Sequence, residues 1–173
     1  MSLWINQEND LIAFLKSNEN IFLEKKLKIL FESDYSPIKL AKFIDRLNPL
    51  IFGINYDIGN SASLGFKCED EFNFYSARII NVHVKDRLLG GTTVPLGKGC
   101  ANFEKVFQFL ARINYQGNYI LQTWLSGFSK TNNKSDWIYF FIASWIIKRN
   151  REGNWWDNKS DSLSIIFLLL ELQ

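Results

Sequence analysis

Ile79-Ile-Asn-Val-His-Val-Lys-Asp86 is a β-branched segment that contains the only histidine of the 173-residue chain. Successive side chains of a strand point to opposite faces, so this segment would have one apolar and one polar face. The apolar face holds Ile80, Val82 and Val84, and the polar face holds Asn81, His83 and Lys85. Because the segment is apolar at its start and polar at its end, we predict a strand of a parallel sheet whose carboxyl end opens into a site.

The composition is typical of a folded protein with a single core. Hydrophobic residues make up 47% of the sequence and aromatic residues 16%, which is enough for a bulky interior. The 20 basic and 18 acidic residues are intermixed and leave a net charge of +2, which argues against a nucleic-acid partner. Cys68 and Cys100 lack metal-ligand spacing, so we expect free thiols in a reducing compartment.

The sequence predicts neither an export signal nor a membrane-spanning helix. Its N-terminus has no basic segment followed by an apolar run. The apolar runs near 137–147 and 163–170 are shorter than the ~20 residues that such a helix needs. We therefore expect a cytoplasmic protein with no membrane partner.

Strands and helices are predicted to alternate along most of the chain. The predicted strands cover residues 28–33, 52–60, 79–86 and 117–124. The predicted helices cover residues 7–17, 37–47, 69–75 and 103–113. Strand–helix repetition predicts a parallel sheet covered by helices. The segment 125–173 differs, since residues 136–149 suit a helix that is apolar nearly all round, and we expect a divergent helical tail packed on the same domain.

Each predicted strand has a polar, inward-facing residue near its carboxyl end. These residues are Glu32, Asp57, His83 and Gln122. Carboxylates and imidazole are ligand types that divalent ions prefer. The alternative explanation is that polar residues collect at strand ends because loops begin there.

Several motifs together resemble the sugar-phosphate isomerase/epimerase family with the xylose-isomerase-like TIM barrel. They are Asn55-Tyr-Asp-Ile-Gly-Asn60, Asn81-Val-His-Val-Lys-Asp86, Val94-Pro-Leu-Gly-Lys-Gly99, Asn102-Phe103 and Gly117-Asn-Tyr-Ile-Leu-Gln-Thr-Trp124. The resemblance covers residues 25–124 and matches only the C-terminal half of the family barrel. It implies an α/β half barrel with about four parallel strands over residues 1–124.

The resemblance also implies a divalent metal ion, Mn, Mg or Zn, at the mouth of the barrel. Carried over by position, its ligands are Glu32, Asp57, His83 and Gln122. The fourth family ligand is normally a glutamate, and an amide cannot accept a proton as a carboxylate does. The first and last ligands are also the family's acid and base, so Glu32 and Gln122 are the candidate catalytic residues. The metal would polarise a substrate carbonyl while a proton leaves the neighbouring carbon.

Polar and cationic residues near the same strand ends are candidates for binding a sugar or its phosphate. They are Asn60, Lys85, Arg87, Lys98 and Trp124. The phosphate sites of TIM barrels often lie in the late loops, which favours the glycine-rich segment 89–99 as part of this site. A flexible connection that carries a few cations is the alternative for this segment.

The sequence therefore predicts a metal-dependent sugar-phosphate isomerase or epimerase, with an alternative that keeps the fold but not the turnover. That alternative is a truncated, non-catalytic remnant or subunit. A complete barrel closes with eight strands. Half a barrel has open edges, so we expect a second polypeptide that completes it or a homo-oligomer. A related barrel of DNA-repair endonucleases uses a multi-histidine site, and a single histidine without a basic surface argues against it.

Overall fold

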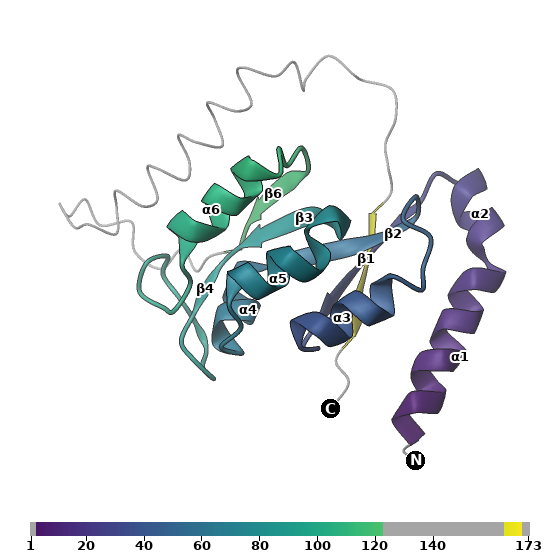
Figure 1. Cartoon of the computed structure of the whole chain (residues 1–173), viewed down its shortest axis with the longest axis horizontal. Helices are drawn as coiled ribbons and strands as arrows, with labels where there is room; N and C mark the ends of the chain where they lie inside the picture. Colours follow the sequence, from purple (N-terminus) through teal and green to yellow (C-terminus); the bar gives the residue numbers. More distant parts are fainter. Residues whose placement is uncertain (1–2, 123–164, 171–173) are drawn as a thin grey trace.

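The computed structural model describes residues 3–122 and 165–170, which form a parallel sheet with helices packed on one face (Figure 1). Four strands follow the predicted order, and adjacent strands pair in parallel. They are β1 (Lys28–Ser33), β2 (Phe52–Asp57), β3 (Ile79–Val84) and β6 (Asn118–Leu121). The sheet order β6-β3-β2-β1 confirms the prediction of an α/β fold like part of a TIM barrel.

The helices agree with the predicted ones to within a few residues, with two additions. They are α1 (Leu3–Ser17), α2 (Glu19–Glu24), α3 (Pro37–Ile44), α4 (Ile58–Ser63), α5 (Cys68–Tyr75) and α6 (Phe103–Arg112), with a 3₁₀ turn at Ser76–Arg78. Neither α2 nor α4 was predicted. Helix α4 replaces the last part of the expected strand 52–60 because Asp57 caps it by accepting the backbone N–H of Asn60.

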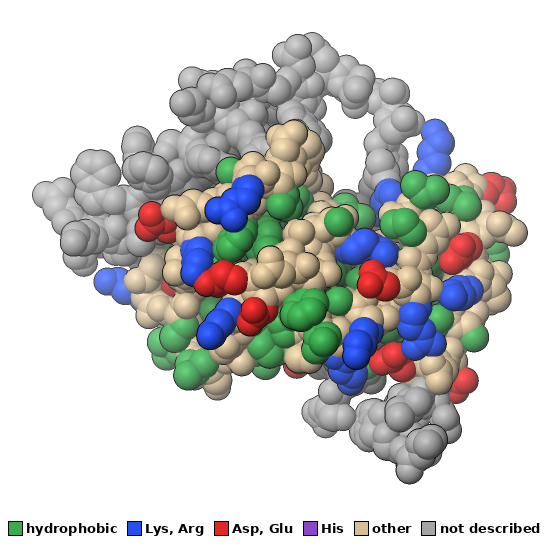
Figure 2. Space-filling view, viewed as in Figure 1, with side chains coloured by type: hydrophobic (Ala, Val, Ile, Leu, Met, Phe, Trp, Pro, Cys, Tyr) green, Lys and Arg blue, Asp and Glu red, His purple; other side chains and the backbone are tan. Residues whose placement is uncertain are grey.

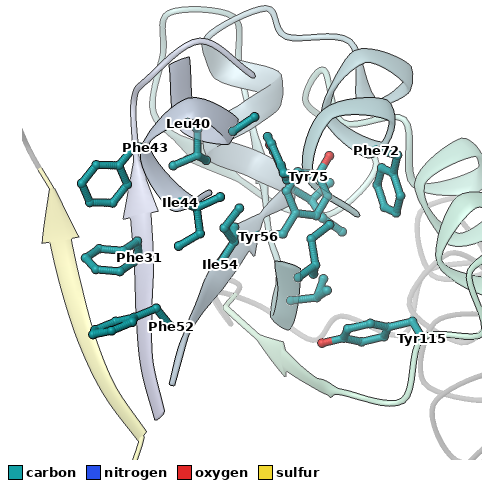
Figure 3. Packing of buried hydrophobic residues seen from close by; sticks show 14 of the residues in the cluster. Phe31, Leu40, Phe43, Ile44, Phe52, Ile54, Tyr56, Phe72, Tyr75 and Tyr115 are labelled. Atoms are coloured by element: carbon teal, nitrogen blue, oxygen red, sulfur yellow. The ribbon is translucent and has the colours of Figure 1, made fainter. Parts of the chain in front are cut away.

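The core lies between the sheet and its helices, where large aromatic side chains interlock (Figure 3). Phe31 of β1 meets Phe43 of α3 edge to face, with ring centroids 5.0 Å apart. Phe52 of β2 stacks beside Phe31, and all three rings are almost completely buried. Aromatic rings in such contacts contribute more than the area they bury. This packing leaves the opposite face of β1 and β2 to carry polar side chains.

The alternation predicted for the histidine strand is wrong at one residue. Ile54 pairs with Ile79 and Asn55 with Asn81, so Ile80 is an extra residue at a β-bulge. Ile79 therefore joins Val82 in the core. Ile80 instead lies over Gly53, and a Cβ at position 53 would collide with the Ile80 side chain. The polar face keeps its predicted residues beyond the bulge.

The prediction of a helical tail is wrong for residues 165–170, the part of the tail that the structure describes. Ile165–Leu170 form a strand, β7, which pairs in parallel with β1 from Lys28 to Ser33 (Figure 1). The sheet order is thus β6-β3-β2-β1-β7. The helix expected over 136–149 lies outside the described residues.

The helix-bearing face shows no single-sign patch among the described side chains, because Lys and Arg are interspersed with Asp and Glu (Figure 2). This agrees with the mixed charges of the sequence. None of the helices in the described part of the chain is long and apolar enough to cross a bilayer.

Candidate metal centre

Three of the four predicted metal ligands converge at the carboxyl ends of neighbouring strands. Glu32 comes from β1, Asp57 from β2 and His83 from β3, and one ligand atom of each lies within 4.8 Å of the others. Nδ1 of His83 is 3.4 Å from Oε2 of Glu32 and 3.7 Å from Oδ2 of Asp57. Parallel pairing causes this convergence, since Asp57 and His83 are direct register partners. Their role as ligands stays a prediction.

The electrostatics of the cluster favour a positive charge at its centre. Burial alone would lower the pKa of His83, but hydrogen bonds and charge interactions with Asp57 and Glu32 raise it to about 9. Burial alone would raise the pKa of Asp57. The hydrogen bonds from His83 and the Asn60 backbone, with the charge of Lys85, instead hold that pKa below its ordinary value. The two neighbouring carboxyl groups therefore favour the protonated form of His83.

The donor set fits a divalent cation. Two carboxylates and one imidazole are the mixture that a borderline ion such as Mn²⁺ or Zn²⁺ accepts. Such an ion would take over the charge that the imidazolium proton supplies, because a ligating imidazole must be neutral.

Asn60, Lys85 and Arg87, predicted to bind substrate, also lie together at the edge of this cluster. Oδ1 of Asn60 accepts from Nζ of Lys85 at 3.2 Å and from Nη1 of Arg87 at 2.7 Å. Lys85 also lies 3.4 Å from Oδ2 of Asp57. Nδ2 of Asn60 donates to Oε1 of Glu32 at 2.6 Å. Asn60 therefore connects the two cations with a candidate ligand.

Within the described part of the chain, the side chains of Gln122 and Lys98 make no hydrogen bond with this cluster, and their roles stay predictions. Gln122 is exposed and follows the last residue of β6, and its backbone N–H donates to the carbonyl of Val84. Lys98 is exposed in the glycine-rich segment. Trp124 lies outside the described residues.

The glycine-rich segment is tied back to the strand end that precedes it. It includes a short antiparallel pair, β4 (Asp86–Arg87) with β5 (Thr93–Val94). Asp86 is fully buried and accepts the backbone N–H groups of Gly99 at 2.8 Å and Ala101 at 3.0 Å. A Cβ at position 99 would overlap the Asp86 carboxylate and the carbonyl of Arg87, so only glycine fits there.

Sequence reasoning missed the buried asparagines that border the ligands. Asn55 and Asn81 precede Asp57 and His83 by two residues, and the period of two was the signal that could have found them. Nδ2 of Asn55 lies 2.6 Å from Oε2 of Glu32 and 3.1 Å from Nδ1 of His83.

Sequence reasoning also missed a buried glutamate on the helix side of the sheet. Glu71 of α5 accepts hydrogen bonds from the hydroxyl groups of Tyr56, Tyr75 and Ser61. Burial raises its pKa, although the three hydroxyl donors oppose the shift. No local pattern marks this residue, because its partners come from three different elements.

Comparison with known proteins finds a matching family model and curated relatives for this chain. The family model described as "Xylose isomerase-like TIM barrel" matches residues 18–139. L-ribulose-5-phosphate 3-epimerase UlaE of Salmonella paratyphi A is 35% identical over 87 residues, which are 50% of this chain and 31% of that protein. Putative L-ribulose-5-phosphate 3-epimerase SgbU of Escherichia coli is 29% identical over 93 residues, 50% of this chain and 32% of that one. The match thus spans about a third of the length of these curated relatives.

Solved structures share the fold at low sequence identity. A D-tagatose 3-epimerase-like protein superposes with a TM-score of 0.57 and 20% identity, over 84% of this chain and 56% of the other. A xylose isomerase domain protein from Planctomyces limnophilus has a TM-score of 0.54 and 22% identity, over 73% of this chain and 49% of the other. At these identities the likeness is one of fold.

Proposed function

Since this chain belongs to the xylose isomerase-like TIM barrel family, we propose that it is a metal-dependent sugar-phosphate isomerase or epimerase-like protein. The observation that carries the proposal is the convergence of Glu32, Asp57 and His83 on one point at the carboxyl end of the sheet. These three residues would hold a divalent ion. When bound, the ion supplies Lewis-acid polarisation of a substrate carbonyl.

Glu32 is the carboxylate that a substrate can reach. Its side chain is 16% exposed, whereas that of Asp57 is 1% exposed. We therefore assign proton transfer to Glu32, which would accept a proton from the carbon next to the carbonyl. Asp57 and His83 are more deeply buried, and their proposed role is to coordinate the cation.

Lys85 and Arg87 are the proposed binding groups for the anionic end of the substrate. The described hydrogen bonds of the Arg87 side chain go to neutral acceptors, Oδ1 of Asn60 and the carbonyl of Gly91. An arginine held by neutral groups keeps its charge available for a phosphate oxygen. The relatives named as L-ribulose-5-phosphate 3-epimerases favour a pentulose phosphate as the substrate class.

A second candidate is a non-catalytic remnant or subunit that keeps the metal centre but not the turnover. Gln122 stands where the resemblance places a second acid–base carboxylate, and an amide cannot take that part. The structural matches also cover about half of the length of the other chains. In this case a second polypeptide or another copy of the chain would complete the barrel.

Two measurements test these proposals. Isothermal titration with Mn²⁺ should show tight binding that His83→Ala abolishes, because the variant loses the only imidazole. Gln108→Ala, on the exposed face of α6, serves as the control and should bind like the wild type. Unchanged affinity of His83→Ala would remove that residue from the site.

The second measurement separates the two candidates. Incubation with Mn²⁺ and a ketose phosphate in deuterium oxide should place deuterium on the carbon next to the carbonyl if the chain is catalytic. Metal binding without deuterium incorporation identifies the remnant or subunit.

A further inference from the structure

Two buried asparagines, Asn55 on β2 and Asn81 on β3, lie side by side on the face that carries the candidate ligands. They are direct register partners. Their exposed fractions are 2% and 0%, so both amides lie away from bulk solvent. Buried amides cost free energy unless they are paired, and their contacts therefore reveal what they hold in place.

Asn81 orients Asn55. Nδ2 of Asn81 donates to Oδ1 of Asn55 across 2.6 Å. Oδ1 of Asn81 has no hydrogen-bond partner among the described residues, so this donated bond sets the orientation of its amide. A reversed Asn55 amide would place its own donors against those of Asn81. Nδ2 of Asn55 is thereby directed toward the ligand cluster.

Asn55 and Asn60 hold the carboxylate of Glu32 from two sides. Nδ2 of Asn55 donates to Oε2 and Nδ2 of Asn60 donates to Oε1, each across 2.6 Å. Hydrogen bonds to an ionised carboxylate are roughly twice as strong as neutral ones. Because both oxygens are held, the plane of the carboxylate is fixed relative to His83 and Asp57.

We propose that Asn81 and Asn55 form a positioning relay that presents the Glu32 carboxylate to the metal ion. The relay rests on the metal centre proposed above and acts through Glu32, without touching a substrate itself. Losing an outer hydrogen-bond partner of a metal ligand typically weakens metal affinity by about 10–100-fold. Asn55 is such a partner, so we expect Asn55→Leu to weaken Mn²⁺ binding on the order of tenfold and Asn81→Leu to weaken it by no more than that.

The test is a calorimetric double-mutant cycle with Mn²⁺ on the full chain. Asn81→Leu and Asn55→Leu should each lose affinity, and the double variant should bind no more weakly than Asn55→Leu, because Asn81 acts only through Asn55. The matched control is Asn118→Leu, which changes the exposed register partner of Asn81 on β6 and should keep wild-type affinity.

A spectroscopic measurement separates positioning from general destabilisation. The visible absorption of the Co²⁺-loaded protein reports the geometry of the ligands. It should change in Asn81→Leu and stay the same in Asn118→Leu.

The outcomes distinguish the relay from the proposed function. Wild-type protein that binds no Mn²⁺ overturns the metal centre. If the wild type binds Mn²⁺ but Asn81→Leu keeps wild-type affinity, the relay alone is overturned. The same holds if the affinity losses of Asn81→Leu and Asn55→Leu add in the double variant.

If Asn81→Leu does not fold, nuclear magnetic resonance on the wild type tests the relay instead. The side-chain amide protons of Asn81 and Asn55 should exchange slowly with solvent, and the Asn55 signal should shift when Zn²⁺ is added. Rapid exchange of either amide, or an Asn55 signal that does not move, overturns the relay.

Discussion

Gln122 is the residue at which this chain departs from the ligand pattern that the family resemblance implies. A carboxylate there would add a charged ligand and a group that can exchange a proton. We expect Gln122→Glu to tighten Mn²⁺ binding on the order of tenfold, since affinity for a hard divalent ion rises with the number of charged oxygen ligands. Calorimetric titration measures the change.

The matched control for this substitution is Gln116→Glu, which adds the same charge to an exposed glutamine in the loop before β6. It should leave Mn²⁺ affinity almost unchanged. Equal affinities of Gln122→Glu and the wild type would show that position 122 does not complete the centre.

The site was predictable from the sequence where local alternation and parallel pairing act together. Parallel strands end at one edge, so the polar residues at three strand ends had to meet. The asparagine relay follows the same alternation but was not predicted, because its significance depends on which amide faces which oxygen. That information arises only when β1, β2 and β3 lie in register.

The junction of β2, α4 and α5 depends on the buried carboxyl of Glu71. Burial, the main cause, raises the pKa of this group, so the folded state binds its proton more tightly than the unfolded state does. The stabilisation from this proton is complete below the unfolded pKa, ordinarily about 4.3, and is lost as the pH rises through the folded pKa. We therefore expect the free energy of unfolding to decrease over that pH range, by at most about 1.4 kcal/mol per pH unit from this group.

Urea unfolding at a series of pH values measures this dependence. Glu71→Gln, which cannot ionise, should flatten the profile relative to the wild type. The control Glu24→Gln makes the same change on an exposed side chain and should leave the profile unaltered. A wild-type profile that Glu71→Gln does not change would place the pH dependence elsewhere.

Elements formed by local patterns were predictable, whereas elements set by distant contacts were not. Helical spacing of its buried residues identified α6, and short apolar runs identified β1 and β3. Helix α4 escaped notice because the Asp57 cap overrides an apolar pattern that continues like a strand. Strand β7 pairs Ile165 with Lys28, residues far apart in the chain, and no local feature of an apolar run reveals its partner.

The whole molecule has a sheet whose two edges differ. β7 covers the outer edge of β1, while β6 is the last strand at the other end of the described sheet. Leu121, at the end of β6, is 51% exposed. No other strand among the described residues pairs with the outer side of β6, and an edge with exposed apolar side chains favours pairing with another chain. The half barrel is therefore expected to associate through β6, with a second copy when no other partner is present.

Sedimentation velocity over a range of concentrations tests this association. The wild type should show a concentration-dependent increase in mass, and Leu121→Lys should remain a monomer, because a lysine on an edge strand opposes pairing. The control is Leu50→Lys, which changes a leucine that is 68% exposed in the turn before β2 and should associate like the wild type. A wild type that stays monomeric at all concentrations and binds no hydrophobic dye would contradict pairing through β6.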